Sequence, residues 1–311
     1  MFEFVFLGTS AAAPSVHRGL AAHVLMHNEY RFLIDCGEGT QRQILQAGIG
    51  YKRLDRILIT HGHLDHILGL AGLLSTFARF EIIDKVEIWA GAGALQRIRD
   101  LVFGVALRGG RPSMEIALVE IGPGRLMDAE DFTITGFPVL HKGSNALGFI
   151  FEEKARRPFL VEKAEALGVP AGSIRRDLVQ GRTISLPDGR AISPEDVLGP
   201  EIAGAKLVHV GDCGDTSNLL EAARGADALV MEATYLEVER EMAREVSHLT
   251  ASQAAELARD AGVKHLYLTH ISRRYRERDV LAEALAVFPE TTVARDFDSF
   301  KVVKGNTAIR S

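Results

Sequence analysis

Short apolar stretches rich in β-branched residues recur along the chain, separated by polar turns and by segments with helical spacing. The run Arg56–Thr60 predicts a buried strand. A different pattern follows Thr250: this residue and Gln253 have capping-box spacing ahead of apolar positions, which predicts a helix that ends at Gly262. Further strands are predicted at 132–140, 205–210, 228–231 and 264–269.

The loop after the first of these strands carries the most informative chemistry in the chain. Three histidines and one aspartate lie within six residues, His61-Gly62-His63-Leu64-Asp65-His66. Imidazole nitrogen and carboxylate oxygen are donors that divalent transition metals prefer, and a tight turn after a strand can direct several of them at one point. The loop therefore predicts a metal site. A chance cluster among eleven histidines is the alternative.

Three other predicted strands also end in residues of the donor type. The strand at 132–140 is followed by His141, the strand at 205–210 by Gly211 and Asp212, and the strand at 264–269 by His270. Functional loops are common at such strand ends in layered α/β folds. The strand ends together supply seven donors, which is enough for two metals. For the remaining histidines near the N-terminus or inside strands we expect structural roles: His17, His23, His27, His209 and His265.

The order of these donors resembles that of the metallo-β-lactamase superfamily, whose pattern is HxHxDH followed by His, Asp and His at later strand ends. Longer segments are similar more narrowly to ribonuclease Z, the endonuclease that trims the 3′ trailer from precursor tRNA. The resemblance covers nearly the whole chain, and the segments beginning at Ile34, Ser247 and Leu268 are the most specific. The similar segments are Phe6–Ser10, Ile34–Gln41, Gly69–Thr76, Glu232–Thr234, Ser247–Thr250 and Leu268–Tyr275.

This resemblance implies the fold, the cofactors and the ligand sets. The fold would be a metallo-β-lactamase-type αββα sandwich, one domain over 1–311 with an inserted flexible arm. The cofactors would be two Zn²⁺ per chain, with Mn²⁺ or Fe²⁺ as alternatives, and the assembly a homodimer. One metal would take His61, His63 and His141, the other would take Asp65, His66 and His270, and Asp212 would bridge them.

The candidate catalytic residues all precede the last predicted strand. His248 lies in the loop before the predicted helix, where it is free to approach a substrate, and Glu232 ends a neighbouring strand. We expect His248 to act as general acid for the leaving 3′-oxygen, with Glu232 fixing its tautomer and Asp65 receiving the proton of the attacking water. A structural role for His248 is the alternative. Ser272 and Arg274 are candidate phosphate contacts, because guanidinium binds phosphate in a bidentate manner.

The least regular part of the chain, about 154–195, looks like an insertion. Four acidic side chains in it could balance its basic groups, which would leave a solvated surface excursion. In ribonuclease Z the corresponding insertion is an arm that grips the tRNA body, and the resemblance favours that alternative. Its basic residues are Lys154, Arg156, Arg157, Lys163, Arg175, Arg176, Arg182 and Arg190.

Composition limits the remaining options. A chain of 311 residues with 47% hydrophobic positions can bury a large core. Its two cysteines suit a reducing compartment, no stretch suggests a signal peptide or membrane span, and we expect a soluble cytoplasmic protein. A net charge of −5 means that affinity for precursor tRNA must come from a local patch.

Two other functions remain open. Gly62 and Leu64 stand where ribonuclease Z usually has Leu and Gly, an arrangement seen in other phosphodiesterase branches. A small-molecule phosphodiesterase or arylsulfatase-like hydrolase of the same fold is therefore the second candidate. A non-catalytic RNA-binding protein with a structural metal site is the third, and the full ligand set with His248 argues against it.

Overall fold

The structure, a computed structural model, describes residues 1–108, 112–142 and 145–310, with the backbone alone over 306–310. The chain divides into two compact units. The larger one contains Met1–Glu152 and Ala205–Ser311, and the smaller one contains Glu153–Gly204. None of the described helices is long and apolar enough to cross a membrane.

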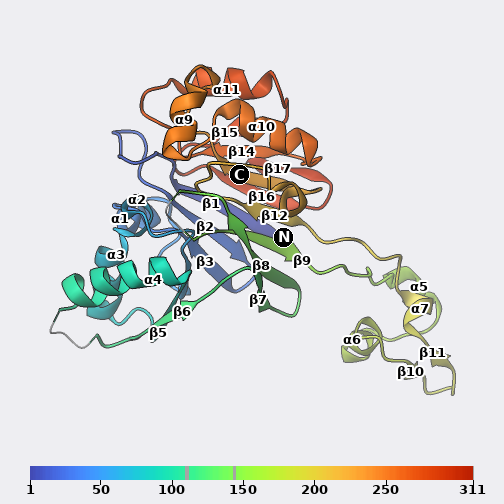
Figure 1. The fold of residues 1–311 in the computed structure, drawn as a ribbon. Helices are drawn as coiled ribbons and strands as arrows, with labels where there is room; N and C mark the ends of the chain where they lie inside the picture. Colours follow the sequence, from blue (N-terminus) through green and yellow to red (C-terminus); the bar gives the residue numbers. More distant parts are fainter. Residues whose placement is uncertain (109–111, 143–144, 311) are drawn as a thin grey trace. The chain divides into compact units, whose positions relative to one another are not determined.

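Two mixed β-sheets form the larger unit (Figure 1). Within the described residues the first sheet has eight strands and the second has seven. In spatial order the first contains β17 (Asn306–Arg310), β16 (Ser299–Val303), β1 (Phe2–Gly8), β2 (Ala22–His27), β3 (Tyr30–Ile34), β4 (Arg56–Leu58), β5 (Lys85–Ala90) and β6 (Glu115–Glu120). The second contains β15 (Thr291–Val293), β14 (Leu266–Thr269), β13 (Ala228–Glu232), β12 (Lys206–His209), β9 (Ala146–Glu153), β8 (Phe132–Val139) and β7 (Gly124–Asp128).

Strand alternation explains why these sheets stack. In β1, Phe2, Phe4 and Phe6 belong to the core between the sheets, whereas Val5 and Leu7 belong to the core on the outer face of the first sheet. Successive side chains of a strand point to opposite faces, so one apolar strand can supply both cores. The inner core also takes Phe149 and Phe151 from β9 and further apolar side chains of the second sheet.

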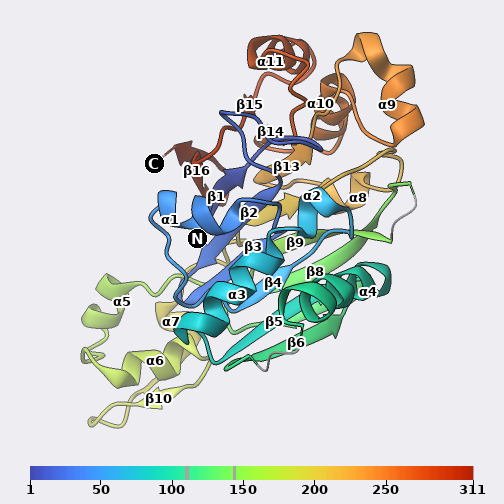
Figure 2. The same ribbon diagram turned by 90° about the vertical axis from the view of Figure 1, so that its left-hand side faces the viewer.

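Helices cover the outer face of each sheet (Figure 2). Packing an apolar helix face against each sheet gives four layers, so the expected αββα sandwich is confirmed. On the first sheet lie α1 (Thr40–Gln46), α2 (Leu64–Ile67), α3 (Leu70–Phe80), α4 (Ala92–Arg99) and the π-helix η1 (Asp100–Ala106). Along the second part of the chain follow α8 (Leu220–Ala223), η2 (Glu237–Glu239), α9 (Arg240–Val246), α10 (Ala251–Asp260) and α11 (Glu277–Leu285).

The capping signal predicted the start of α10 correctly. The Thr250 side chain accepts a hydrogen bond from the Gln253 backbone N–H at 3.2 Å, and the Gln253 side chain accepts one from the Thr250 N–H at 3.0 Å. Gly262 adopts a positive φ just past the helix end, as a terminating glycine does. His248 is held in the short loop between α9 and α10.

The smaller unit has a core of its own, formed by seven buried apolar side chains. Of the eight basic residues in the predicted arm, four form ion pairs inside the unit. These pairs are Arg157 with Glu195, Arg175 with Glu165, Arg182 with Asp177 and Arg190 with Asp188. Arg156, Lys163 and Arg176 have no carboxylate at ion-pair distance among the described residues. Its elements are α5 (Val161–Ala166), α6 (Ser173–Val179), β10 (Ile184–Ser185), β11 (Ala191–Ile192) and α7 (Pro194–Val197).

Candidate metal centre

Parallel strands of both sheets bring the seven predicted donors to one place. In the first sheet β3 and β4 are parallel, and in the second β12, β13 and β14 are parallel, so their carboxyl ends lie side by side. The loop from His61 to His66 follows β4, Asp212 follows β12 and His270 follows β14. His141 comes from the end of β8. The predicted position at strand ends is the position that the structure shows.

A close backbone approach fixes the loop after β4. The Cys36 N–H donates to the His66 carbonyl at 2.7 Å, and the Gly69 N–H donates to the Cys36 carbonyl at 2.9 Å. A Cβ atom on Gly37 would lie 2.4 Å from the Asp65 carbonyl oxygen, so only glycine fits there. The Asp35-Cys36-Gly37 segment therefore packs against the metal loop and fixes its backbone. This contact gives a physical role to the Ile34–Gln41 motif noted in the sequence.

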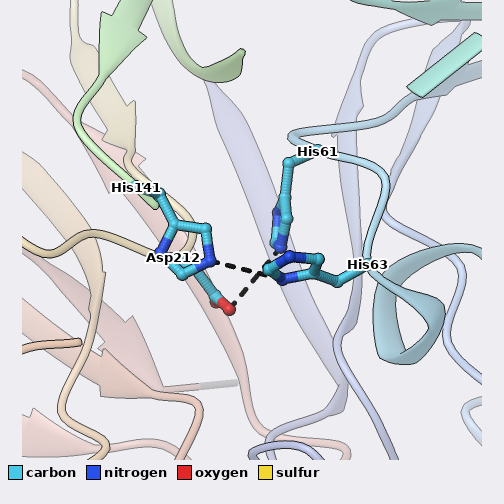
Figure 3. A group of neighbouring side chains, drawn as sticks. All are labelled: His61, His63, His141 and Asp212. Atoms are coloured by element: carbon cyan, nitrogen blue, oxygen red, sulfur yellow. Dashed lines mark hydrogen bonds and ion pairs between the residues drawn. The ribbon is translucent and has the colours of Figure 1, made fainter. Parts of the chain in front are cut away.

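The first donor group contains His61, His63, His141 and Asp212 (Figure 3). One ligand atom from each lies within 4.8 Å of the others. His141 Nε2 is 3.3 Å from His63 Nδ1, and His61 Nε2 is 3.7 Å from Asp212 Oδ2. Separations of this size are too long for strong direct bonds but fit donors arranged around a common ion.

The second donor group contains Asp65, His66, Asp212 and His270. His66 Nε2 lies 3.4 Å from Asp212 Oδ2, and His270 Nε2 lies 3.4 Å from Asp212 Oδ1. Because Asp212 Oδ2 also lies 3.7 Å from His61 Nε2, this carboxylate belongs to both groups. Asp212 is placed where a bridging ligand would be.

Buried atoms without partners show that these residues fit a metal. His61 Nε2, His66 Nε2, His270 Nε2 and Asp212 Oδ1 are buried and have no hydrogen-bond partner in the described part of the chain. Leaving buried polar atoms unsatisfied is costly, so such groups are rare unless they meet an ion or water. Four of them converging on one point, all of ligand type, match a divalent metal centre.

The opposite ring nitrogen is anchored in three of the ligand histidines. His66 Nδ1 lies 2.8 Å from Asp35 Oδ2, and His141 Nδ1 lies 2.8 Å from the Ser247 carbonyl. His270 Nδ1 lies 2.9 Å from Thr234 Oγ1. Such partners fix the ring orientation and tautomer of a metal-binding histidine. The roles of Asp35 and Thr234 were not predicted, although Asp35 directly follows the end of β3 and Thr234 lies two residues past the end of β13.

Electrostatics keeps the central carboxylate ionised. Burial opposes the charged form of Asp212, but His270 and His66 outweigh it and hold the pKa of this carboxyl well below its usual value. For His66, burial acts against the charge, while Asp212 and Asp35 outweigh it and raise its pKa well above the usual range. The cluster therefore presents an anionic ligand between imidazoles.

His248 and Glu232 form a hydrogen-bonded pair beside the donors. His248 Nδ1 lies 2.9 Å from Glu232 Oε1, and its ring centre is 5.2 Å from that of His141. Glu232 is fully buried and also accepts hydrogen bonds from the Cys213 and Leu249 backbone N–H groups. Burial opposes the charge on His248, yet Glu232 with more distant carboxylates raises its pKa to about 9.

Glu232, His248 and His270 form a third group that could hold a cation, since each offers one ligand atom within 4.8 Å of the others. Glu232 Oε1, however, is already engaged by His248 and by the Cys213 N–H, and its Oε2 by Thr234 and Leu249. This carboxylate is satisfied by donors of the chain itself. Its arrangement is that of a group that orients an imidazole.

Comparison with known proteins gives the family. A ribonuclease Z from Bradyrhizobium diazoefficiens is 45% identical over 97% of this chain and all of the relative's length. The chain belongs to the ribonuclease Z family. The ribonuclease Z of Archaeoglobus fulgidus is 38% identical over 97% of this chain and 98% of its own length.

A solved structure agrees with this membership, and two family models match other descriptions. The crystal structure of human tRNase Z, short form, matches with a TM-score of 0.68 and 25% identity, over 96% of this chain and 99% of the human one. The family described as a beta-lactamase superfamily domain matches residues 167–271, and that of the anti-Pycsar protein Apyc1 matches residues 2–156. The ribonuclease Z resemblance read from the motifs is therefore confirmed.

Two candidate phosphate contacts are not gathered with the donors. Arg274 is exposed, and its Nη1 lies 3.4 Å from Glu239 Oε1. Ser272 Oγ accepts a weak hydrogen bond from the Arg274 backbone N–H at 3.4 Å. Both lie just past His270, so their contact with ribonuclease Z substrates stays a prediction.

The other buried histidines have contacts expected of structural residues. His209 Nε2 lies 3.2 Å from His23 Nδ1, and both rings pack against Phe4. Burial, and then the neighbouring His209, hold the pKa of His23 well below its usual value, and burial lowers the pKa of His209 to about 4. A pair of neutral imidazoles between the sheets fits the structural role expected for these two residues.

Proposed function

We propose that this protein is a metal-dependent endoribonuclease that removes the 3′ trailer from precursor tRNA. The observation that carries the proposal is the joint presence of two donor groups sharing Asp212 and of the His248–Glu232 pair beside them. Membership of the ribonuclease Z family over 97% of the chain supplies the substrate class. The products would be a tRNA with a 3′-hydroxyl and a trailer with a 5′-phosphate.

The donor sets suit two divalent cations per chain, and we propose zinc as the resident metal. His61, His63 and His141 would hold one ion, Asp65, His66 and His270 the other, with Asp212 shared. When bound, the pair would activate a water molecule as nucleophile and neutralise charge that develops on the phosphate oxygens. Manganese or iron would fit the same donors.

The chain's own residues would move the two protons of the reaction. The attacking water forms a bond to phosphorus as the bond from phosphorus to the 3′-oxygen breaks. Asp65, whose Oδ2 is held by the Ala12 N–H at 3.1 Å, is placed to accept the proton that the water loses. Glu232 holds Nδ1 of His248 and raises the pKa of this imidazole against the effect of burial, so that His248 would donate from Nε2 to the leaving 3′-oxygen.

We propose that the smaller unit supplies part of the RNA affinity. The protein as a whole carries a net charge of −5, so phosphate binding requires local basic groups. Arg156, Lys163 and Arg176 remain available for phosphates because no described carboxylate pairs with them. Contacts of this kind position RNA without reading its sequence. A homodimer in the cytoplasm remains our expectation for the assembly and its location.

A small-molecule phosphodiesterase or arylsulfatase is the second candidate, favoured by Gly62 in the metal loop. A gel assay with unmodified precursor tRNA, run beside cyclic nucleotides and aryl sulfates, separates the two. We expect cleavage at the trailer junction and at most slow turnover of the small esters. Fast hydrolysis of a small ester with intact precursor tRNA would replace the proposed function by the second candidate.

A further inference from the structure

A solvent-open cavity of about 370 Å³ adjoins the first donor group. One wall is the metal loop at His61 and His63, and the other is helix α4, which contributes Ala94 and Arg97. Its volume lies in the range of small-ligand sites and is large enough for one nucleotide. The proposed mechanism assigns nothing to this cavity or to Arg97.

Gly62 determines the form of this cavity. A Cβ atom at position 62 would lie 3.1 Å from Ala94 Cα and 3.3 Å from Arg97 Cδ, tighter than ordinary van der Waals contact. The absence of a side chain therefore lets α4 lie directly against the metal loop. Consequently the aliphatic part of Arg97 passes beside the loop, and Arg97 lines the cavity. Figure 2 shows α4 beside α3 on the outer face of the first sheet.

The charge of Arg97 is uncompensated. Its side chain is exposed, and no carboxylate in the described ranges lies at ion-pair distance from it. A guanidinium group binds phosphate through paired N–H donors, and an arginine beside a hydrolytic centre for phosphodiesters is well suited to the phosphate next along the strand. The cavity thus combines a cation, the edge of the donor cluster and an opening to solvent.

The position of His248 indicates which side of the cut the cavity serves. The His248 ring lies beside His141 and His270, with ring centres 5.2 and 5.4 Å away. The cavity is lined instead by His61 and His63. In the proposed reaction His248 donates to the leaving 3′-oxygen and the attacking water lies opposite that oxygen, so the trailer's 5′-oxygen points to the side of this axis. The cavity, which His248 does not line, is available to the nucleotide attached there.

We propose that this cavity receives the first trailer nucleotide and that Arg97 binds the phosphate between the first and second trailer nucleotides. The inference rests on the proposed function and adds a subsite to it. Arg97 would be a positioning residue, since it contacts the substrate away from the reacting atoms.

A charge-deletion cycle tests the contact. One partner is Arg97→Ala, and the other is a precursor tRNA carrying an uncharged methylphosphonate at that trailer phosphate. In the wild-type protein the neutral linkage should lower kcat/KM by about tenfold, and in Arg97→Ala by less than about twofold, because a charged hydrogen bond can be lost only once. The loss should reside in KM, and the salt dependence of binding should weaken by nearly one charge.

Matched variants separate this contact from general charge and folding effects. Arg99 lies on the exposed face of the same helix but does not line the cavity. Arg99→Ala therefore removes one positive charge and should keep the tenfold sensitivity to the neutral linkage. Arg97→Lys keeps the charge without the paired donors and should recover part of the sensitivity. Equal unfolding temperatures for these variants would show that the fold is retained.

Three results would overturn the inference. Equal sensitivity of wild type and Arg97→Ala to the neutral linkage would remove the contact. Coupling of Arg97 to a phosphate on the tRNA side would reverse the assignment of the subsite. Wild-type protein that hydrolyses bis(p-nitrophenyl) phosphate but leaves precursor tRNA intact would refute the proposed function and the subsite with it. Normal cleavage of precursor tRNA without coupling between Arg97 and the neutral trailer linkage would refute the subsite alone.

Discussion

Removing the imidazole of His248 tests the proposed proton donor. We expect His248→Ala to lower turnover on precursor tRNA by about 10²–10⁴, or about 3 to 5 kcal/mol of transition-state stabilisation, the usual scale for general acid catalysis. The variant should fold, since Glu232 keeps hydrogen bonds from the Cys213 N–H at 2.7 Å and the Leu249 N–H at 3.2 Å. The buried carboxylate of Glu232 therefore keeps hydrogen-bond donors in the variant.

The substrate and a matched histidine make this test specific. A nitrophenolate leaving group needs no proton, so His248→Ala should lose much less activity on bis(p-nitrophenyl) phosphate than on precursor tRNA. His265 offers the control, because its side chain is 14% exposed against 17% for His248. It directly precedes β14, at the end of the strand opposite to the donor His270. His265→Ala should leave the ratio of the two activities unchanged.

The measurement is steady-state turnover on both substrates, with metal content determined for every variant. An equal loss on both substrates would refute general acid catalysis by His248. A loss of metal in His248→Ala would instead identify this residue as a ligand, through the group that it forms with Glu232 and His270.

Three further predictions concern the metals and the RNA. Metal-replete protein should contain two divalent ions per chain by elemental analysis, and full activity with one ion would refute the binuclear centre. Asp35→Asn should weaken metal binding by about 10- to 100-fold in a chelator competition, since Asp35 orients His66; unchanged affinity would deny it that role. Replacing Arg156, Lys163 and Arg176 together by alanine should weaken precursor-tRNA binding and flatten its salt dependence. The control replaces Lys52, Arg53 and Lys264 of the larger unit by alanine, and it should change neither property. Equal effects of the two sets would leave the smaller unit without a specific role.

The sequence was sufficient to predict that these donor-type side chains come together, because their signal is local. A strand that ends in a ligand-type residue can be recognised within a few positions, as at Asp212 and His270, and parallel strands then bring such ends together. The capping box of α10 is equally local, and it placed the helix start at the correct residue.

Features that depend on packing between distant segments were not predictable in this way. Asp35 meets His66 across 31 positions of sequence, and Thr234 meets His270 across 36. Nothing near Arg97 in the sequence indicates that α4 lies against the metal loop, because that contact depends on the missing side chain of Gly62. The separate core of the smaller unit likewise arises from apolar residues spread from Ala164 to Val197.

End-group analysis of the cleavage products tests the central claim most directly. Metal-reconstituted protein acting on precursor tRNA should yield a tRNA with a 3′-hydroxyl and a trailer with a 5′-phosphate, and prior removal of metal by a chelator should abolish both products. A 2′,3′-cyclic phosphate on the tRNA, or cleavage that survives complete metal removal, would contradict water attack at a metal centre built from these donors.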